Sequence, residues 1–162
     1  MRFGVTFLLA SLMLRSAPDA WLDRDLAAVA TLGTPEQLTA LVTLGANVDG
    51  HDLDGATPLM RAASADNSAA IKILLKHGAD PNLSTDDGWS PLHVAALRGA
   101  VHAAQALVDG GARVDAEDSY GWTALALASQ HRSPEIVRLL LAAGSDPNGR
   151  KQPTPLDRPT KV

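Results

Sequence analysis

The chain has 162 residues, of which 46% are apolar and 20% charged, and its formal net charge is −4. It has the size of one globular domain, with enough apolar residues to bury a core. The negative charge and the lack of a basic run exclude nucleic acid as the main partner, because phosphate binding relies on clustered Lys and Arg. With no cysteine, the chain has no disulfide, thiol nucleophile or thiolate metal site.

The first twenty residues have the pattern of a secretory signal peptide. Arg2 precedes a run of uncharged, mostly apolar residues from Phe3 to Leu14, which is followed by a polar stretch. Arg15 departs from the pattern, since a neutral cleavage region is expected there. The apolar run is shorter than the roughly 20 residues that cross a bilayer, so we expect no permanent membrane span.

In an alternative interpretation, this segment is the second helix of an N-terminal capping repeat. Its apolar residues lie 33 positions before apolar residues of the first predicted repeat: Val5, Leu8 and Leu9 before Leu38, Leu41 and Val42. A cap must present a polar outer face to water, and here Thr6 and Ser11 are the polar residues of the run. We therefore favour a signal peptide at 1–20, a repeat domain at 21–157 and a tail at 158–162.

A period of 33 residues runs through the domain. The phrases "GANVD", "GADPN", "GARVD" and "GSDPN" recur at this spacing, beginning at Gly45, Gly78, Gly111 and Gly144. Two sets of leucines follow the same period: Leu26, Leu59, Leu92 and Leu125, and Leu41, Leu74, Leu107 and Leu140. Such self-similarity is typical of stacked repeats. We number the repeats one to four, at about 22–54, 55–87, 88–120 and 121–153, with a truncated fifth beginning at 154–157.

Each repeat predicts two short helices followed by an extended loop. In repeat three, Ser90 is a suitable N-cap, and Pro91 suits the first helical position because no N–H is needed there. Leu92, Ala95 and Ala96 follow at helical spacing. Helices of about ten residues are marginal alone in water. The repeats must therefore stack, each covering the apolar flanks of its neighbours.

The second helices carry a similar signal. "TPEQL" and "SPEIV" place a hydroxyl N-cap, a proline and a glutamate at the helix start. The expected buried stripes are Ile71, Leu74 and Leu75 in repeat two, and Val137, Leu140 and Leu141 in repeat four. The glycine after each second helix predicts a left-handed C-terminal cap.

"GATPLMRAA", "GWSPLHVAA" and "LLKHGADPN" resemble ankyrin repeats, over about residues 22–157. The resemblance implies an all-α solenoid of helix–turn–helix units joined by β-hairpin-like loops. It also implies a protein-binding module rather than an enzyme. Repeat one lacks the Thr-Pro phrase, repeat two has Met60 where the family has His, and repeat four has Ala124 and Ala126 for Pro and His. Because the fifth repeat is truncated, we expect Ile136 or Leu139 to be partly exposed.

The sequence offers no catalytic constellation. The histidines, at 51, 77, 93, 102 and 131, do not have HExxH spacing, and we predict no metal site, cofactor or catalytic residue. The family resemblance implies that His93 stabilises the loops by hydrogen bonding. We interpret "DLDGAT" at 52–57 and "DDGWS" at 86–90 as hairpin turns rather than calcium loops.

The resemblance places partner binding on the concave face, formed by the hairpin tips and the first helices. The candidate residues at the tips are Leu53, Asp54, Asp86, Asp87, Trp89, Tyr120 and Trp122, and those at the helix ends are Leu97, Arg98, Gln130 and His131. Trp89 and Trp122 are predicted to form an exposed ladder, since Trp, Tyr and Arg are enriched at interface hot spots. The alternative is that each Trp packs over a neighbouring hairpin as part of the fold.

These observations favour a monomeric protein-binding module that is periplasmic or secreted. Such a module would mask or assist a protein partner, for example a co-exported enzyme or toxin. The alternative is a cytoplasmic regulator of a cytosolic or transcriptional complex, with residues 1–20 as a genuine cap. An enzyme that uses His93 or His131 would need a nucleophile or metal that the sequence does not supply.

Overall fold

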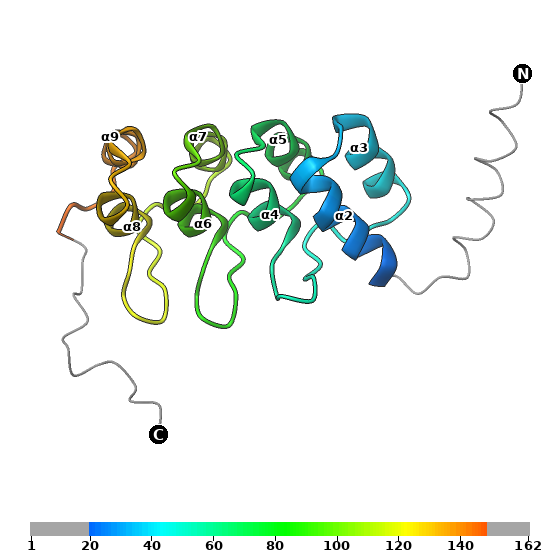
Figure 1. Cartoon of the computed structure of the whole chain (residues 1–162), viewed down its shortest axis with the longest axis horizontal. Coiled ribbons are helices and arrows are strands. Elements are labelled where there is room, and N and C mark those ends of the chain that lie inside the picture. Colours follow the sequence, from blue (N-terminus) through cyan, green and yellow to red (C-terminus); the bar gives the residue numbers. More distant parts are fainter. Residues whose placement is uncertain (1–19, 149–162) are drawn as a thin grey trace, which may run out of the picture.

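The computed structural model describes residues 20–148, where it shows eight helices in four antiparallel pairs (Figure 1). Residues 1–19 of the predicted signal peptide, and the truncated fifth repeat, lie outside the described residues. The helices are α2 (Ala20–Leu32), α3 (Pro35–Thr43), α4 (Pro58–Ser64), α5 (Ser68–Lys76), α6 (Pro91–Arg98), α7 (Val101–Asp109), α8 (Ala124–Gln130) and α9 (Pro134–Ala142).

The helix pairs stack side by side, and the loops between them project to one side of the stack (Figure 1). Helices α2, α4, α6 and α8 form one row, which packs neighbour against neighbour, and α3, α5, α7 and α9 form the other. The regular β-structure of the described part is limited to one isolated antiparallel bridge, between Glu117 and Thr123. The predicted all-α repeat solenoid is therefore confirmed.

The helices of the first row begin where the sequence predicts. Thr57, Ser90 and Thr123 cap α4, α6 and α8, and each hydroxyl oxygen accepts the backbone N–H three residues on, at 3.3, 3.5 and 3.3 Å. Prolines occupy the first position of α4 and α6. Helix α8 begins at the same repeat position although Ala124 replaces the proline, so the hydroxyl cap is the signal that the three helices share.

In the second row, side-chain N-caps were predicted for α3 and α9, and the structure has one at α3 but not at α9. Thr34 and Gln37 form a reciprocal capping box at α3, with distances of 3.0 and 3.3 Å. Ser133, which was expected to cap α9 in the same way, makes no side-chain capping bond. Four glycines follow the second helices with φ between +88° and +99°, as expected for left-handed caps: Gly45, Gly78, Gly111 and Gly144.

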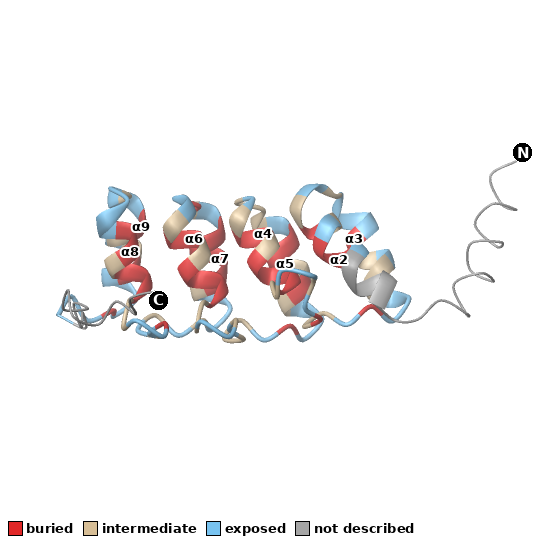
Figure 2. Cartoon of the chain, turned by 60° about the horizontal axis from the view of Figure 1, so that its bottom comes forward, coloured by how far each residue is buried: buried red, intermediate tan, exposed pale blue. Residues whose placement is uncertain are grey.

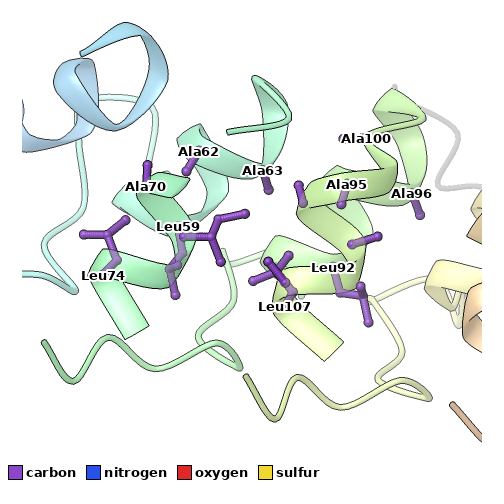
Figure 3. Close-up of a cluster of buried hydrophobic side chains, with 14 of the residues drawn as sticks. Leu59, Ala62, Ala63, Ala70, Leu74, Leu92, Ala95, Ala96, Ala100 and Leu107 are labelled. Carbon is purple, nitrogen blue, oxygen red and sulfur yellow. The ribbon is translucent and has the colours of Figure 1, made fainter. Parts of the chain in front are cut away.

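The core is a continuous layer of leucine and alanine between the helix pairs. Leu59 of α4 and Leu92 of α6 hold the same repeat position in the buried cluster, together with alanines of the same helices, whose small side chains allow the backbones to approach closely (Figure 3). Ala62 and Ala95 are fully buried. Figure 2 shows this pattern along the whole stack, with the buried residues concentrated on the facing sides of the helices. Each repeat thus covers apolar surface that its neighbour would otherwise expose.

The buried stripe of α9 differs from the one expected. Ile136 and Leu140 are fully buried, Val137 is half-buried, and Leu141 is 43% exposed. Of the two residues of which one was expected to be partly exposed, Leu139 is half-buried and Ile136 is fully buried. Ile136 and Leu140, which are four positions apart, lie on the side of α9 that faces the preceding repeat. Leu141, one position after Leu140, points away from it.

The recurring Asp or Asn after each glycine cap connects one repeat to the next. Asp49 Oδ1 accepts the backbone N–H of Asp80 at 3.0 Å, and Asp115 Oδ1 accepts that of Asp146 at 3.0 Å. In the same way, Asn82 Oδ1 accepts the backbone N–H of Arg113, in repeat three, at 2.8 Å. This ladder satisfies backbone groups that the left-handed turns leave open and fixes the spacing of the loops.

Candidate protein-binding surface

Three hairpin loops, at residues 50–57, 83–90 and 116–123, project beside the first row of helices (Figure 1). We call these loops and that helix row the hairpin face. Each loop is closed by one backbone N–H···O bond across its base, of 2.9 to 3.0 Å: Asp52 to Ala56, Thr85 to Trp89, and Asp118 to Trp122. The expected hairpin turns are therefore present.

Side chains at the same repeat position brace the loops internally. Asp52 Oδ1 accepts the backbone N–H groups of Asp54 and Ala56 at 2.9 and 3.0 Å. Asp118 Oδ1 accepts those of Tyr120 and Trp122 at 2.9 and 2.8 Å. Asp118 is buried despite its charge. These loops are therefore held by their own side chains as well as by the stack behind them, which lowers the ordering cost of binding.

Arg61 of α4 ties the first loop to the helix row. Its guanidinium bonds Asp52 Oδ2 at 2.6 Å and also pairs with Asp54. Burial alone would raise the pKa of Asp52, but the hydrogen bonds from Arg61, Ala56 and Asp54 outweigh it, so the pKa lies below its ordinary value. Asp52 is therefore ionised at neutral pH.

His93 joins repeats three and four. Its Nδ1 lies 2.8 Å from Ser90 Oγ and 3.2 Å from the backbone nitrogen of Ser90, and its Nε2 lies 3.0 Å from the carbonyl oxygen of Trp122. This geometry fits a neutral ring that donates from Nε2 and accepts at Nδ1. Burial lowers the pKa of His93, although the Trp122 carbonyl and Asp118 act in the opposite direction. The partners of His93 are structural groups of the loops.

Five of the seven predicted binding residues at the loop tips are open to solvent. Leu53 is 88% exposed and Tyr120 is 50% exposed. Asp54, Asp86 and Asp87 are also exposed. Within residues 25–148, Asp86, Asp87 and the neighbouring Glu117 form no ion pair. The tips therefore present apolar and aromatic groups beside uncompensated carboxylates.

Three of the four predicted residues at the helix ends are open to solvent. Arg98, Gln130 and His131 are exposed at the ends of α6 and α8, and Leu97 is half-buried. In the described part of the chain, no side-chain hydrogen bond or ion pair links these four residues to the loops.

The two tryptophans are not the exposed ladder that was expected. Trp89 and Trp122 are half-buried and pack against the hydrophobic core. The ring of Trp89 lies 6.1 Å from that of His93, with an interplanar angle of 49°. This placement agrees with the alternative in which the Trp side chains are part of the fold, and each leaves only part of its ring for a partner.

The sequence missed a largely apolar groove at the N-terminal end of this surface. A groove of about 380 Å³ lies between α2, the first loop and α4, lined by Ala27, Ala28, Thr31, Leu32, Asp52, Leu53, Asp54 and Arg61. Leu32, at the end of α2, is 90% exposed. The period could have revealed it, because Leu32 stands where the other repeats have Ala65, Arg98 and His131. Its proximity to Leu53 depends on the fold.

No group of three or more His, Asp or Glu side chains between 25 and 148 could hold a metal ion. Among the helices described, none is long and apolar enough to cross a membrane. The hairpin face is the surface where exposed apolar, aromatic and charged groups occur together.

The comparisons with known proteins agree with this architecture. The family model described as Ankyrin repeats (3 copies) matches residues 26–118 and 67–151, which together make up more than half of the chain. The chain belongs to the ankyrin repeat family. Ankyrin repeats are protein-interaction modules, and the helix pairs and hairpins of this ankyrin repeat protein are the parts that the family model matches.

One curated relative is the Ankyrin repeat and LEM domain-containing protein 1 homolog of Caenorhabditis elegans. This ankyrin repeat protein is 45% identical to it over 56 residues, which are 35% of the chain and 8% of the relative. The match therefore extends over a small part of the relative's length.

Proposed function

We propose that this ankyrin repeat protein is a non-enzymatic module that holds a protein partner against its hairpin face. The observation that carries the proposal is the row of braced loops, whose tips expose Leu53, Tyr120 and the carboxylates of Asp86 and Asp87. Pre-organised loops lose little conformational entropy on binding. Mixed apolar and charged tips suit a partner surface with apolar anchors and positive charge.

The module acts outside the cytoplasm in this proposal, as a monomer that masks or assists a co-exported enzyme or toxin. The supporting observation is the pattern of residues 1–20, with Arg2 before a short apolar run. Sequencing the N-terminus of the mature protein tests this part. A mature chain that begins near Ala20 supports export, and a chain that retains Met1 or Arg2 favours the alternative, a cytoplasmic regulator.

Affinity capture with matched variants tests the binding face. The full-length protein, a Tyr120→Ala/Asp87→Asn variant and a Lys72→Ala/Gln105→Ala control are immobilised, and partners from the producing cells and their medium are quantified. Lys72 and Gln105 are exposed on α5 and α7, in the other helix row. The proposal expects a partner that the hairpin variant loses and the control retains. Loss in the control alone, or capture equal in all three, contradicts it.

A further inference from the structure

We infer that the groove between α2 and the first hairpin loop receives one large aliphatic or aromatic side chain of a partner segment, with a basic residue of the same segment lying against the acidic loop tips. This inference rests on the proposed function and names the chemistry of the partner. The most exposed large apolar residues of the described chain, Leu32 at 90% and Leu53 at 88%, both line this groove.

The two leucines replace polar or small residues at equivalent positions of the other repeats. Leu32 corresponds to Ala65, Arg98 and His131, and Leu53 corresponds to Asp86 and Ser119. At the first gap between a helix end and the following loop, the two positions are thus occupied by Leu32 and Leu53. At the next two gaps, the equivalent positions are occupied by Ala65 and Asp86, and by Arg98 and Ser119. Because both leucines are almost fully exposed, packing within the described chain does not require leucine at either position.

The floor and rim of the groove are fixed in place. Ala27 is 3% exposed and belongs to the face of α2 that packs on α4. The rim is the first loop, which Arg61 holds through Asp52 and Asp54. A volume of about 380 Å³ lies at the small end of the range for pockets that take organic ligands. It accommodates a Leu, Ile, Met or Phe side chain with part of its backbone.

The charge around the groove selects for a basic partner. Asp52 and Asp54 share Arg61 as their cation, and the next loop adds Asp86 and Asp87, which form no ion pair within residues 25–148. A second copy of the chain would bring the same carboxylates to the interface and be repelled. A segment with an apolar anchor and a nearby Lys or Arg satisfies both features.

Selection from random dodecapeptides displayed on phage tests the inference on the full-length protein. Enriched peptides are synthesised with a fluorescent label and titrated by polarisation against the wild type, Leu32→Asp, Leu53→Asp and the control Leu44→Asp. Leu44 is 50% exposed at the end of α3 and does not line the groove. The inference expects peptides with an apolar residue near Lys or Arg. Each groove variant should weaken them at least about tenfold, the control should not, and added salt should weaken them.

The outcomes separate the inference from the function on which it rests. If the peptides bind Leu32→Asp and Leu53→Asp as tightly as the wild type but do not bind Tyr120→Ala, the groove assignment is overturned and the binding role of the hairpin face is retained. Enrichment of acidic peptides, or no enrichment above background, also overturns the groove assignment. Peptides whose affinity is unchanged by all of these variants contradict the binding role of the hairpin face as well. A lower melting temperature of Leu53→Asp without any peptide would show that the chain itself fills the groove, which also overturns the inference.

Discussion

Repeats three and four each have two helices and share a leucine at one position of each helix, yet their side chains have diverged where the neighbouring repeat matters. In repeat three, Ala96 is fully buried, and the equivalent Ser129 of repeat four is exposed. His93 holds the loop of the following repeat, whereas Ala126 replaces it in repeat four. Within residues 20–148, repeat four is covered on one side only.

The difference shows which features belong to the helix pair and which belong to the interface. Leu107 and Leu140, which pack toward the preceding repeat, are fully buried in both. On the other flank, Leu125 and Leu141 line an open groove of about 190 Å³. Ala126 and Ser129, which differ from their equivalents in repeat three, line this open flank, as expected when stability is a sum of neighbour interfaces.

Truncation of the first-helix leucines should give the largest contrast between the two repeats. We expect Leu92→Ala to lower the free energy of unfolding by about 3 kcal/mol and Leu125→Ala by about 2 kcal/mol. Leu92 is 1% exposed between two repeats, while Leu125 lies at the open groove, where water can fill the space left behind. Urea unfolding monitored by circular dichroism measures both. An equal or larger loss for Leu125→Ala would remove the distinction.

Removal of His93 should have the next largest effect. His93→Ala deletes a buried ring with hydrogen bonds to Ser90 and the Trp122 carbonyl, so we expect a loss of about 2 kcal/mol in urea unfolding. The reciprocal change Ala126→His should alter stability by no more than about 0.5 kcal/mol. If the free energy of unfolding falls equally in the two variants, the stabilising effect of the imidazole does not depend on a following loop.

The same histidine predicts a pH dependence. Burial lowers the pKa of His93 in the folded state, so below the ordinary histidine pKa of about 6.5 the unfolded chain takes up a proton that the folded chain does not. Stability is therefore complete above that pH and falls as the pH drops below it, by at most about 1.4 kcal/mol per pH unit.

Unfolding curves at several pH values check this dependence. His93→Ala should abolish this component, while His131→Ala, at an exposed site, should retain it. A pH dependence unchanged in His93→Ala would assign it to other groups.

The smallest effect concerns the turn between the two helices. Gly99 has φ of +69° there, and Arg132 holds φ of +55° at the equivalent position of repeat four. The left-handed conformation costs a residue with a side chain about 1 kcal/mol. We expect Arg132→Gly to raise stability by about 0.5 kcal/mol, after the entropy that glycine adds to the unfolded chain.

The matched substitution Gly99→Ala should act in the opposite direction, lowering stability by about 1 kcal/mol. Its Cβ would also lie 3.3 Å from Ser133 Oγ. Differential scanning calorimetry compares the two variants with the wild type. A stabilised Gly99→Ala would show that the turn relaxes at no cost.

The sequence was sufficient to predict the repeat architecture, because its signals are local. Thr57, Ser90 and Thr123 mark helix starts through bonds to N–H groups three residues away. The glycine caps likewise act within one turn. The recurrence of Asp49 and Asn82 was visible in the period, but their partners lie in the next repeat and became clear only in the structure.

The candidate surface was harder to predict because it depends on tertiary placement. Trp89 and Trp122 lie at hairpin positions that suggest exposure, yet both pack against the core. Leu32 looks like the last apolar residue of a helix, and its 90% exposure beside Leu53 follows from the way α2 ends next to the first loop. The exposed tips of the hairpins were predictable, whereas the groove that they border was not.

Site-specific photo-crosslinking tests most directly whether the hairpin face holds a protein partner. A photoreactive phenylalanine analogue replaces Tyr120, which is 50% exposed at a loop tip, in the producing cells, with Gln105 of α7 as the matched position in the other helix row. The account predicts one discrete crosslinked protein from position 120 and none from position 105. Crosslinks from position 105 alone, or from neither position, would contradict it.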